Sequence, residues 1–293
     1  NECNPCFGEQ PLEALYKEKQ ILVEWMEPSI QILSEKETSK YDAILLNSPK
    51  LTKESINPKN NKVKIVSRFG VGYDSVDLNV LKKNKIILTN TPNAVKRPVA
   101  VASLTMVLSL SGKLMIKDNL VRKGLWNERT NHMGVGLTNK TLGIVGFGGI
   151  GREFVKISKD LFKNVICYDP FVDKGEMENL QVDKVDFDQI AKSSDFLVIL
   201  CDLNEKTRGM IDSTFLNKMK NSSYLINLSR GPVVNEKHLI TSLKQNKISG
   251  AGLDVMTNEP IEDDNELLNL KNTILTPHSL CWTDECFDSI ATE

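Results

Sequence analysis

Hydrophobic residues in the second half of the chain form short runs, rich in β-branched residues, that alternate with segments of helical periodicity. Between Ile150 and Leu161 the apolar positions recur at spacings of four, three and four residues, which places them on one face of a helix. This alternation is typical of βαβ units and predicts a Rossmann-type, doubly wound parallel sheet in an α/β fold. The predicted strands are Thr141–Val145, Val165–Tyr168, Phe196–Leu200, Tyr224–Asn227, Ala251–Val255 and Thr273–Leu275, and further helices are expected at Phe187–Ala191, Ser213–Met219 and Glu236–Gln245.

The first hundred residues repeat this pattern on a smaller scale and predict a second, smaller α/β domain. Its expected strands are Ile21–Val23, Ala43–Leu46, Lys64–Ser67 and Ile86–Thr89. A long helix is expected from Val99 to about Arg122, with Pro98 in its first turn, where the missing N–H is not needed. Because this helix is apolar on nearly all sides, it is either core or a contact in a homodimer.

Charge and composition limit the classes of partner that the protein is expected to bind. The 293 residues carry 37 Lys and Arg against 38 Asp and Glu, a net charge of −1, so no electrostatic footprint for nucleic acid or an anionic membrane is expected. The longest weakly polar run, 98–112, is too short to cross a bilayer. No secretory signal is visible, and the chain begins without Met, so we expect a processed or fragmentary sequence and a cytoplasmic protein.

The six cysteines of the chain permit one alternative to a protein without metal, which is a zinc site. Cys3 and Cys6 form a CxxC, and Cys281 with Cys286 forms a wider pair, which together would supply four thiols to a zinc ion. The spacing is irregular, however, and Cys167 and Cys201 lie in apolar runs as small hydrophobic residues. We therefore expect free thiols and no metal.

A glycine-rich turn points to a nucleotide. Gly146, Gly148 and Gly151 fit GxGxxG directly between a predicted strand and a predicted helix. The first glycine permits the tight turn, the second lets the backbone approach a pyrophosphate, and the third lets the helix pack closely on the strand. The helix N-terminus then faces the phosphates.

Asp169 ends the next strand, 18 residues after Gly151, where a carboxylate accepts hydrogen bonds from a ribose 2′-hydroxyl. Since the same carboxylate would repel a 2′-phosphate, NAD is the expected cofactor. The alternative is a solvated acid at a strand end, before the turn residue Pro170.

Three polar residues follow the carboxyl ends of three predicted strands: Arg230, Glu259 and His278. Ligands of open α/β sheets bind at that edge, so the three residues are expected to share one site. An arginine offers a fork of donors to a carboxylate, a histidine moves a proton near neutral pH, and a glutamate holds the imidazolium. Taken singly, each residue also fits an ordinary role as a carbonyl cap, a surface acid or a hydrogen-bonded core histidine.

The stretch from Arg68 to His278 resembles the D-isomer-specific 2-hydroxyacid dehydrogenase family, which includes phosphoglycerate and glycerate dehydrogenases. The matching segments, in the family's order, are RFGVGYD (68–74), NTPN (90–93), the glycine motif with Asp169, LSRGP (228–232), GLDV (252–255), NEP (258–260) and TPH (276–278).

The resemblance implies a catalytic trio of Arg230, Glu259 and His278, with His278 as proton donor in reduction. It implies NAD contacts from Gly149, Ile150, Asp169, Leu228, Ser229, Arg230, Asp254 and His278, and contacts with the substrate carboxylate from the backbone of Val71 and Gly72. It also implies a flavodoxin-like substrate domain at 1–97, the NAD domain at 98–279, and a truncated start of a return segment to the first domain at 280–293.

The expected function is therefore hydride transfer between NAD and C2 of a small 2-hydroxy or 2-oxo acid. One alternative on the same scaffold is a NAD(H) sensor or corepressor, and another is oxidation of formate or phosphite. Turnover of 2-oxo acids would distinguish the hydroxyacid dehydrogenase from the NAD(H) sensor.

Overall fold

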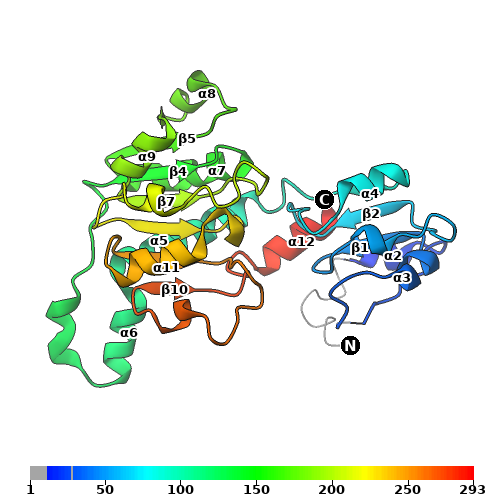
Figure 1. The fold of residues 1–293 in the computed structure, drawn as a ribbon, viewed down its shortest axis with the longest axis horizontal. Coiled ribbons are helices and arrows are strands. Elements are labelled where there is room, and N and C mark those ends of the chain that lie inside the picture. Colours follow the sequence, from blue (N-terminus) through cyan, green and yellow to red (C-terminus); the bar gives the residue numbers. More distant parts are fainter. Residues whose placement is uncertain (1–11, 28) are drawn as a thin grey trace. The chain divides into compact units, whose positions relative to one another are not determined.

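The computed structural model describes residues 12–27 and 29–293. These residues fall into two compact units (Figure 1). Unit 1 contains the chain up to Val95 together with Trp282–Glu293, and unit 2 contains Lys96–Cys281. Cys3 and Cys6 lie outside the described residues.

Unit 2 is built on a seven-stranded parallel sheet with the order β10-β9-β8-β7-β4-β5-β6. The chain starts at β4, builds outward through β5 and β6, and then returns to β7 on the other side of β4. The prediction of a doubly wound sheet is confirmed, and the order reverses between β4 and β7, where such folds bind ligands. The strands are β4 (Thr141–Val145), β5 (Asn164–Tyr168), β6 (Asp183–Lys184), β7 (Phe196–Ile199), β8 (Tyr224–Asn227), β9 (Gly250–Leu253) and β10 (Thr273–Leu275).

Both faces of this sheet are buried. In β7, Phe196 and Val198 pack in one core with residues of α5 and α7, whereas Leu197 and Ile199 pack in a second core with residues of α9, α10 and α11. Because successive side chains of a strand point to opposite faces, the apolar run fills both cores. The helices of unit 2 are α5 (Lys96–Gly112), α6 (Leu114–Arg122), α7 (Gly149–Ser158), α8 (Lys174–Glu178), α9 (Phe187–Ser193), α10 (Ser213–Leu216) and α11 (Glu236–Lys244), with short 3₁₀ turns η3 (Trp126–His132), η4 (Lys159–Leu161), η5 (Gly231–Val233) and η6 (Glu266–Asn269).

Two expectations for unit 2 are wrong. The sheet has a seventh strand, β6, which is only two polar residues long at the sheet edge and leaves no hydrophobic pattern. The single helix expected from Val99 to Arg122 is two helices, because Lys113 takes a left-handed conformation with φ of 52° between them. Among the described residues no single helix has the length and hydropathy of a membrane span, and α5 with α6 meets that test only as a pair bent by 58°.

Unit 1 has a three-stranded parallel sheet in the order β1-β2-β3. The segment Ile21–Val23, expected as a strand, lies outside this sheet, and Leu22 is 85% exposed; a three-residue apolar run is too short to define a strand by its period. The last helix joins this unit, where Phe287 stacks on Phe69. The elements are α2 (Glu13–Lys17), α3 (Glu35–Lys40), β1 (Ala43–Leu46), η2 (Lys53–Ser55), β2 (Ile65–Arg68), α4 (Leu78–Lys83), β3 (Ile87–Thr89) and α12 (Asp284–Thr292).

Candidate functional site

The turn from β4 to α7 requires glycine at its first position. Gly146 has φ of +101°, a backbone conformation that side chains rarely adopt. A Cβ atom there would lie 2.7 Å from the backbone nitrogen of Cys201, just after β7. The turn is therefore pressed against the point where the sheet order reverses.

The other two glycines of the motif have opposite surroundings. A Cβ on Gly151 would lie 2.3 Å from the carbonyl oxygen of Gly146, so this glycine lets α7 pack on the turn. Gly148 is the N-cap of α7, and no atom lies within 4 Å of the place its Cβ would take. The space over Gly148, at the N-terminus of α7, is therefore open, whereas the Lys96 side chain lies over the neighbouring Gly149, where a Cβ would be 2.5 Å from its Cε. An opening at a helix N-terminus is what the pyrophosphate of a dinucleotide requires.

Asp169 follows β5 and is fixed on the same turn. Its Oδ2 accepts a hydrogen bond from the N–H of Phe147 at 2.8 Å, and its Oδ1 accepts one from the N–H of Phe171 at 2.9 Å. A carboxylate has about four acceptor sites, so both oxygens can also accept from ribose hydroxyls. The residues of this turn thus fit NAD.

The loop after β8 carries Arg230 and is held by Asn227, which is buried at the strand's end. The Asn227 side chain accepts from the N–H and hydroxyl of Ser229 and donates to the carbonyl oxygen of Arg230 at 3.0 Å. The Arg230 Nη1 donates to the carbonyl oxygen of Ser229 at 2.7 Å. Leu228 and Ser229 are both buried in this loop.

Gly231 brings that loop into contact with the loop after β9. A Cβ on Gly231 would lie 1.8 Å from the carbonyl oxygen of Met256, so the two backbones meet with no room for a side chain. The N–H of Met256 in turn donates to Oε1 of Glu259 at 2.9 Å. The positions of Arg230 and Glu259 are therefore linked through backbone contact.

Glu259 and His278 lie in direct contact. The Nδ1 atom of His278 is 2.7 Å from Oε2 of Glu259. This contact holds the imidazole by one ring nitrogen and leaves the opposite nitrogen, Nε2, for chemistry. Among the histidines of the chain, His238 instead accepts the N–H of Ser213 at its Nδ1.

The turn that carries His278 is held by a buried carboxylate. Oδ1 of Asp254 accepts from the Thr276 hydroxyl at 2.6 Å and from the N–H groups of Ser279 and Leu280 at 3.1 and 3.2 Å. His278 itself has φ of 54°, a left-handed conformation that costs energy in a residue with a Cβ and that these hydrogen bonds maintain.

The electrostatics of the pair favour a charged carboxylate. Burial alone would raise the pKa of Glu259, but hydrogen bonding and charge from His278, the N–H of Met256 and the more distant charge of Arg230 lower this pKa below its ordinary value. Glu259 is therefore an anion at neutral pH, and an anion is the partner that an imidazolium needs.

The structure brings most of the residues predicted as a site into unit 2, at the carboxyl edge of its sheet: the glycine turn, Asp169, the 228–230 loop, Asp254, Glu259 and His278. Val71 and Gly72 belong to unit 1, after β2, where the Asn90 side chain donates to the Val71 carbonyl oxygen at 2.8 Å. Sequence reasoning missed Asn227, although a single polar residue at the end of an apolar strand was a visible signal. It assigned no role to Thr276, although the segment TPH (276–278) was noted, because that role follows from the contact of its hydroxyl with Asp254.

Comparisons with known proteins agree with this geometry. Residues 104–279 match the family model described as "D-isomer specific 2-hydroxyacid dehydrogenase, NAD binding domain". The chain is 37% identical over 251 residues to a D-3-phosphoglycerate dehydrogenase of Archaeoglobus fulgidus, covering 85% of this chain and 47% of that protein. It is 34% identical over 276 residues to a glyoxylate reductase of Thermococcus litoralis, covering 91% of this chain and 83% of that protein.

The fold matches a solved D-lactate dehydrogenase of Aquifex aeolicus, complexed with NAD and lactic acid, with a TM-score of 0.86, 27% identity and coverage of 100% of this chain and 90% of that one. The protein is thus an α/β protein with a dinucleotide-binding unit. The chain belongs to the D-isomer-specific 2-hydroxyacid dehydrogenase family. Its cofactor is NAD. It spans about half the length of the phosphoglycerate dehydrogenases that it matches.

Proposed function

We propose that the protein is a NAD-dependent dehydrogenase that interconverts a small D-2-hydroxy acid and the corresponding 2-oxo acid. The observation that carries this proposal is the 2.7 Å contact between Glu259 and His278 at the carboxyl edge of the NAD-binding sheet, next to the loop of Arg230. Unit 2 binds NAD, and unit 1 acts as the substrate domain.

Each residue has one task. Arg230 binds the substrate carboxylate through two parallel N–H donors. His278 donates a proton from Nε2 to the oxygen on C2 during reduction and takes it back during oxidation. Glu259 holds the Nδ1–H of the ring and stabilises the imidazolium. Bound NADH supplies the hydride that C2 accepts in reduction, and NAD⁺ accepts it in oxidation.

The test is a panel of glyoxylate, hydroxypyruvate, pyruvate and branched 2-oxo acids, with NADH consumption followed by absorbance. The proposal predicts turnover of at least one of these acids and formation of the D-hydroxy acid. Tight NADH binding without turnover of any of them would favour a NAD(H) sensor instead.

A homodimer is part of the proposal. The segment of α6 and η3 extends away from the sheet (Figure 1) and exposes apolar side chains, including Leu114, Met115, Val121 and Trp126, which are 54–58% exposed. Exposed apolar patches of this kind mark contacts between proteins. Sedimentation of the protein and of Trp126→Glu would test this: the proposal expects a dimer that the substitution weakens, and a wild-type monomer would contradict it. We also place the protein in the cytoplasm.

A further inference from the structure

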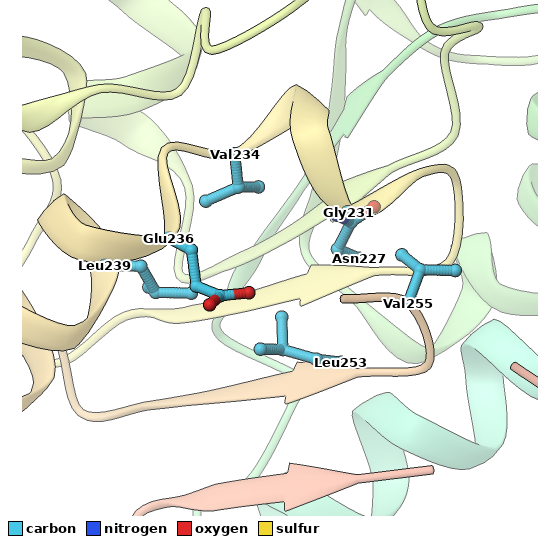
Figure 2. Close-up of a pocket in the computed structure, with 7 residues that line it drawn as sticks. All are labelled: Asn227, Gly231, Val234, Glu236, Leu239, Leu253 and Val255. Carbon is cyan, nitrogen blue, oxygen red and sulfur yellow. The ribbon is translucent and has the colours of Figure 1, made fainter. Parts of the chain in front are cut away.

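A small cavity lies between β8, β9 and the start of α11 (Figure 2), and Gly231, which follows Arg230, contributes to its lining. Most of its lining is apolar. Two polar side chains reach it, Asn227 from the end of β8 and Glu236 from the first turn of α11. Asn227 holds the Arg230 loop, which leaves Glu236 without a part in the chemistry described so far. The lining residues are Asn227, Gly231, Val234, Glu236, Leu239, Leu253 and Val255.

Glu236 binds both ends of the loop that carries Glu259. Its Oε2 accepts the N–H of Thr257 at 3.1 Å, next to Met256, whose own N–H donates to Glu259. Its Oε1 accepts from the Nδ2 of Asn265 at 2.8 Å, at the far end of the same loop. One carboxylate thus ties the beginning and the end of this loop to the rigid helix α11.

Helix capping does not account for these contacts. An acid in a first helical turn is commonly explained by its attraction to the helix dipole. In α11 the capping bond is made by another residue, since the Asn235 side chain accepts the N–H of His238. The Glu236 carboxylate is bonded to groups outside the helix, and both groups lie on the Glu259 loop.

We infer that Glu236 is a positioning residue that, together with Asn265, fixes the loop so that Glu259 meets His278. This inference rests on the proposed function, since it assigns Glu236 a role in the proton transfer. Glu236 touches neither substrate nor cofactor in this scheme. It acts by limiting the positions that the Glu259 loop can take, and loss of such support lowers the rate of a step that depends on geometry.

An exchange of polarity between the two side chains tests the pairing. In Glu236→Gln one of the two acceptor oxygens becomes an NH2 group, which then faces a donor, either the Asn265 amide or the N–H of Thr257, and in Asn265→Asp two carboxylates face each other. In the double variant, Glu236→Gln with Asn265→Asp, the new glutamine donates to the new aspartate while its oxygen still accepts from Thr257. The net charge and the number of hydrogen bonds are then those of the native pair. Glu262→Gln is the matched control, because it makes the same exchange of a carboxylate for an amide on the same loop, and the glutamine oxygen can still accept the hydrogen bond from the exposed Asn258 side chain.

Three quantities are measured for each variant: kcat and KM with the best 2-oxo acid, the NADH dissociation constant by fluorescence, and hydrogen exchange at the amides of Met256 and Thr257. The inference predicts that each single variant lowers kcat about two- to tenfold, the range expected for one hydrogen bond. The NADH dissociation constant should stay within about twofold of the wild-type value. The double variant should recover most of kcat, and Glu262→Gln should behave as wild type.

Native kcat and native exchange in both single variants would overturn the inference, as would a double variant no faster than the slower single one. If the wild-type protein reduces none of the 2-oxo acids, the proposed function fails by itself. Hydrogen exchange then decides the remaining claim: faster exchange at Thr257 in Glu236→Gln than in Glu262→Gln supports loop positioning, and equal exchange refutes it.

Discussion

Two alanine substitutions in the glycine turn separate folding from cofactor binding. In Gly151→Ala the new Cβ lies 2.3 Å from the backbone oxygen of Gly146, an atom that cannot move without shifting the turn. Overpacking of this kind costs about 1–3 kcal/mol. In Gly148→Ala the new Cβ meets no atom within 4 Å, and the φ of −71° suits alanine, so the stability change should stay within about 0.5 kcal/mol.

The same Gly148→Ala substitution should nevertheless damage NADH binding, because its methyl group fills the space in front of the α7 N-terminus where a pyrophosphate must approach. Loss of even one charge-assisted hydrogen bond to phosphate, about 1.5–3 kcal/mol, weakens binding roughly tenfold or more. We expect Gly148→Ala to lose NADH affinity at an unchanged Tm, and Gly151→Ala to lower Tm by about 2–12 °C.

The assay is NADH fluorescence titration with thermal unfolding of the same preparations. Gly175→Ala, at an open position in α8, is the control for the general effect of replacing glycine. Native NADH affinity in Gly148→Ala would refute the placement of the pyrophosphate, whatever the result for Gly151→Ala.

Three further predictions concern single side chains. Asp169→Ala should weaken NADH binding by about 1.5–3 kcal/mol and reduce the ratio of the affinity for NADH to that for NADPH. An unchanged ratio in titrations would exclude a contact between Asp169 and the ribose. Arg230→Lys keeps the charge but loses one of the two parallel hydrogen bonds, so kcat/KM for the 2-oxo acid should fall while the NADH dissociation constant stays unchanged; equal loss of both would mean that Arg230 is structural or binds the cofactor. The lowered pKa of Glu259 stabilises the fold above its ordinary value of 4.5, and this stabilisation disappears as the pH falls through the lowered pKa. The Tm difference between wild type and Glu259→Gln should therefore shrink on acidification, and a pH-independent difference would contradict this linkage.

Most of the sheet of unit 2 was predictable because its central strands are buried on both faces. The boundaries of β4, β8 and β10 agree with those expected from the hydrophobic runs, since in a parallel sheet covered by helices such runs begin and end with the strands. The break between α5 and α6 was missed, although Gly112 stands at it, because the left-handed residue is Lys113, and a glycine followed by further apolar residues is also compatible with a continuous helix.

The sequence predicted that the site residues lie at the carboxyl edge of the sheet, but it did not predict which of their side chains contact one another. Chain order places Glu259 and His278 after neighbouring strands, β9 and β10, and parallel strands end at a common edge. Their 2.7 Å contact depends on how the loop after β9 folds back, which hydrophobic periodicity does not record. Asp254 illustrates the same limit, since its sequence position cannot reveal that Oδ1 holds the turn of His278.

The most direct test of the proton-transfer role is a single-turnover experiment on wild type and His278→Gln. Enzyme loaded with NADH is mixed with saturating amounts of the 2-oxo acid that the wild type reduces, and the loss of NADH absorbance is followed. Glutamine keeps a polar side chain but cannot donate a proton as an acid, and general acid catalysis supplies about 10²–10⁴-fold in rate. We expect His278→Gln to bind NADH with native affinity and to oxidise it more slowly by a factor in that range. Oxidation of NADH at the wild-type rate in His278→Gln would contradict it.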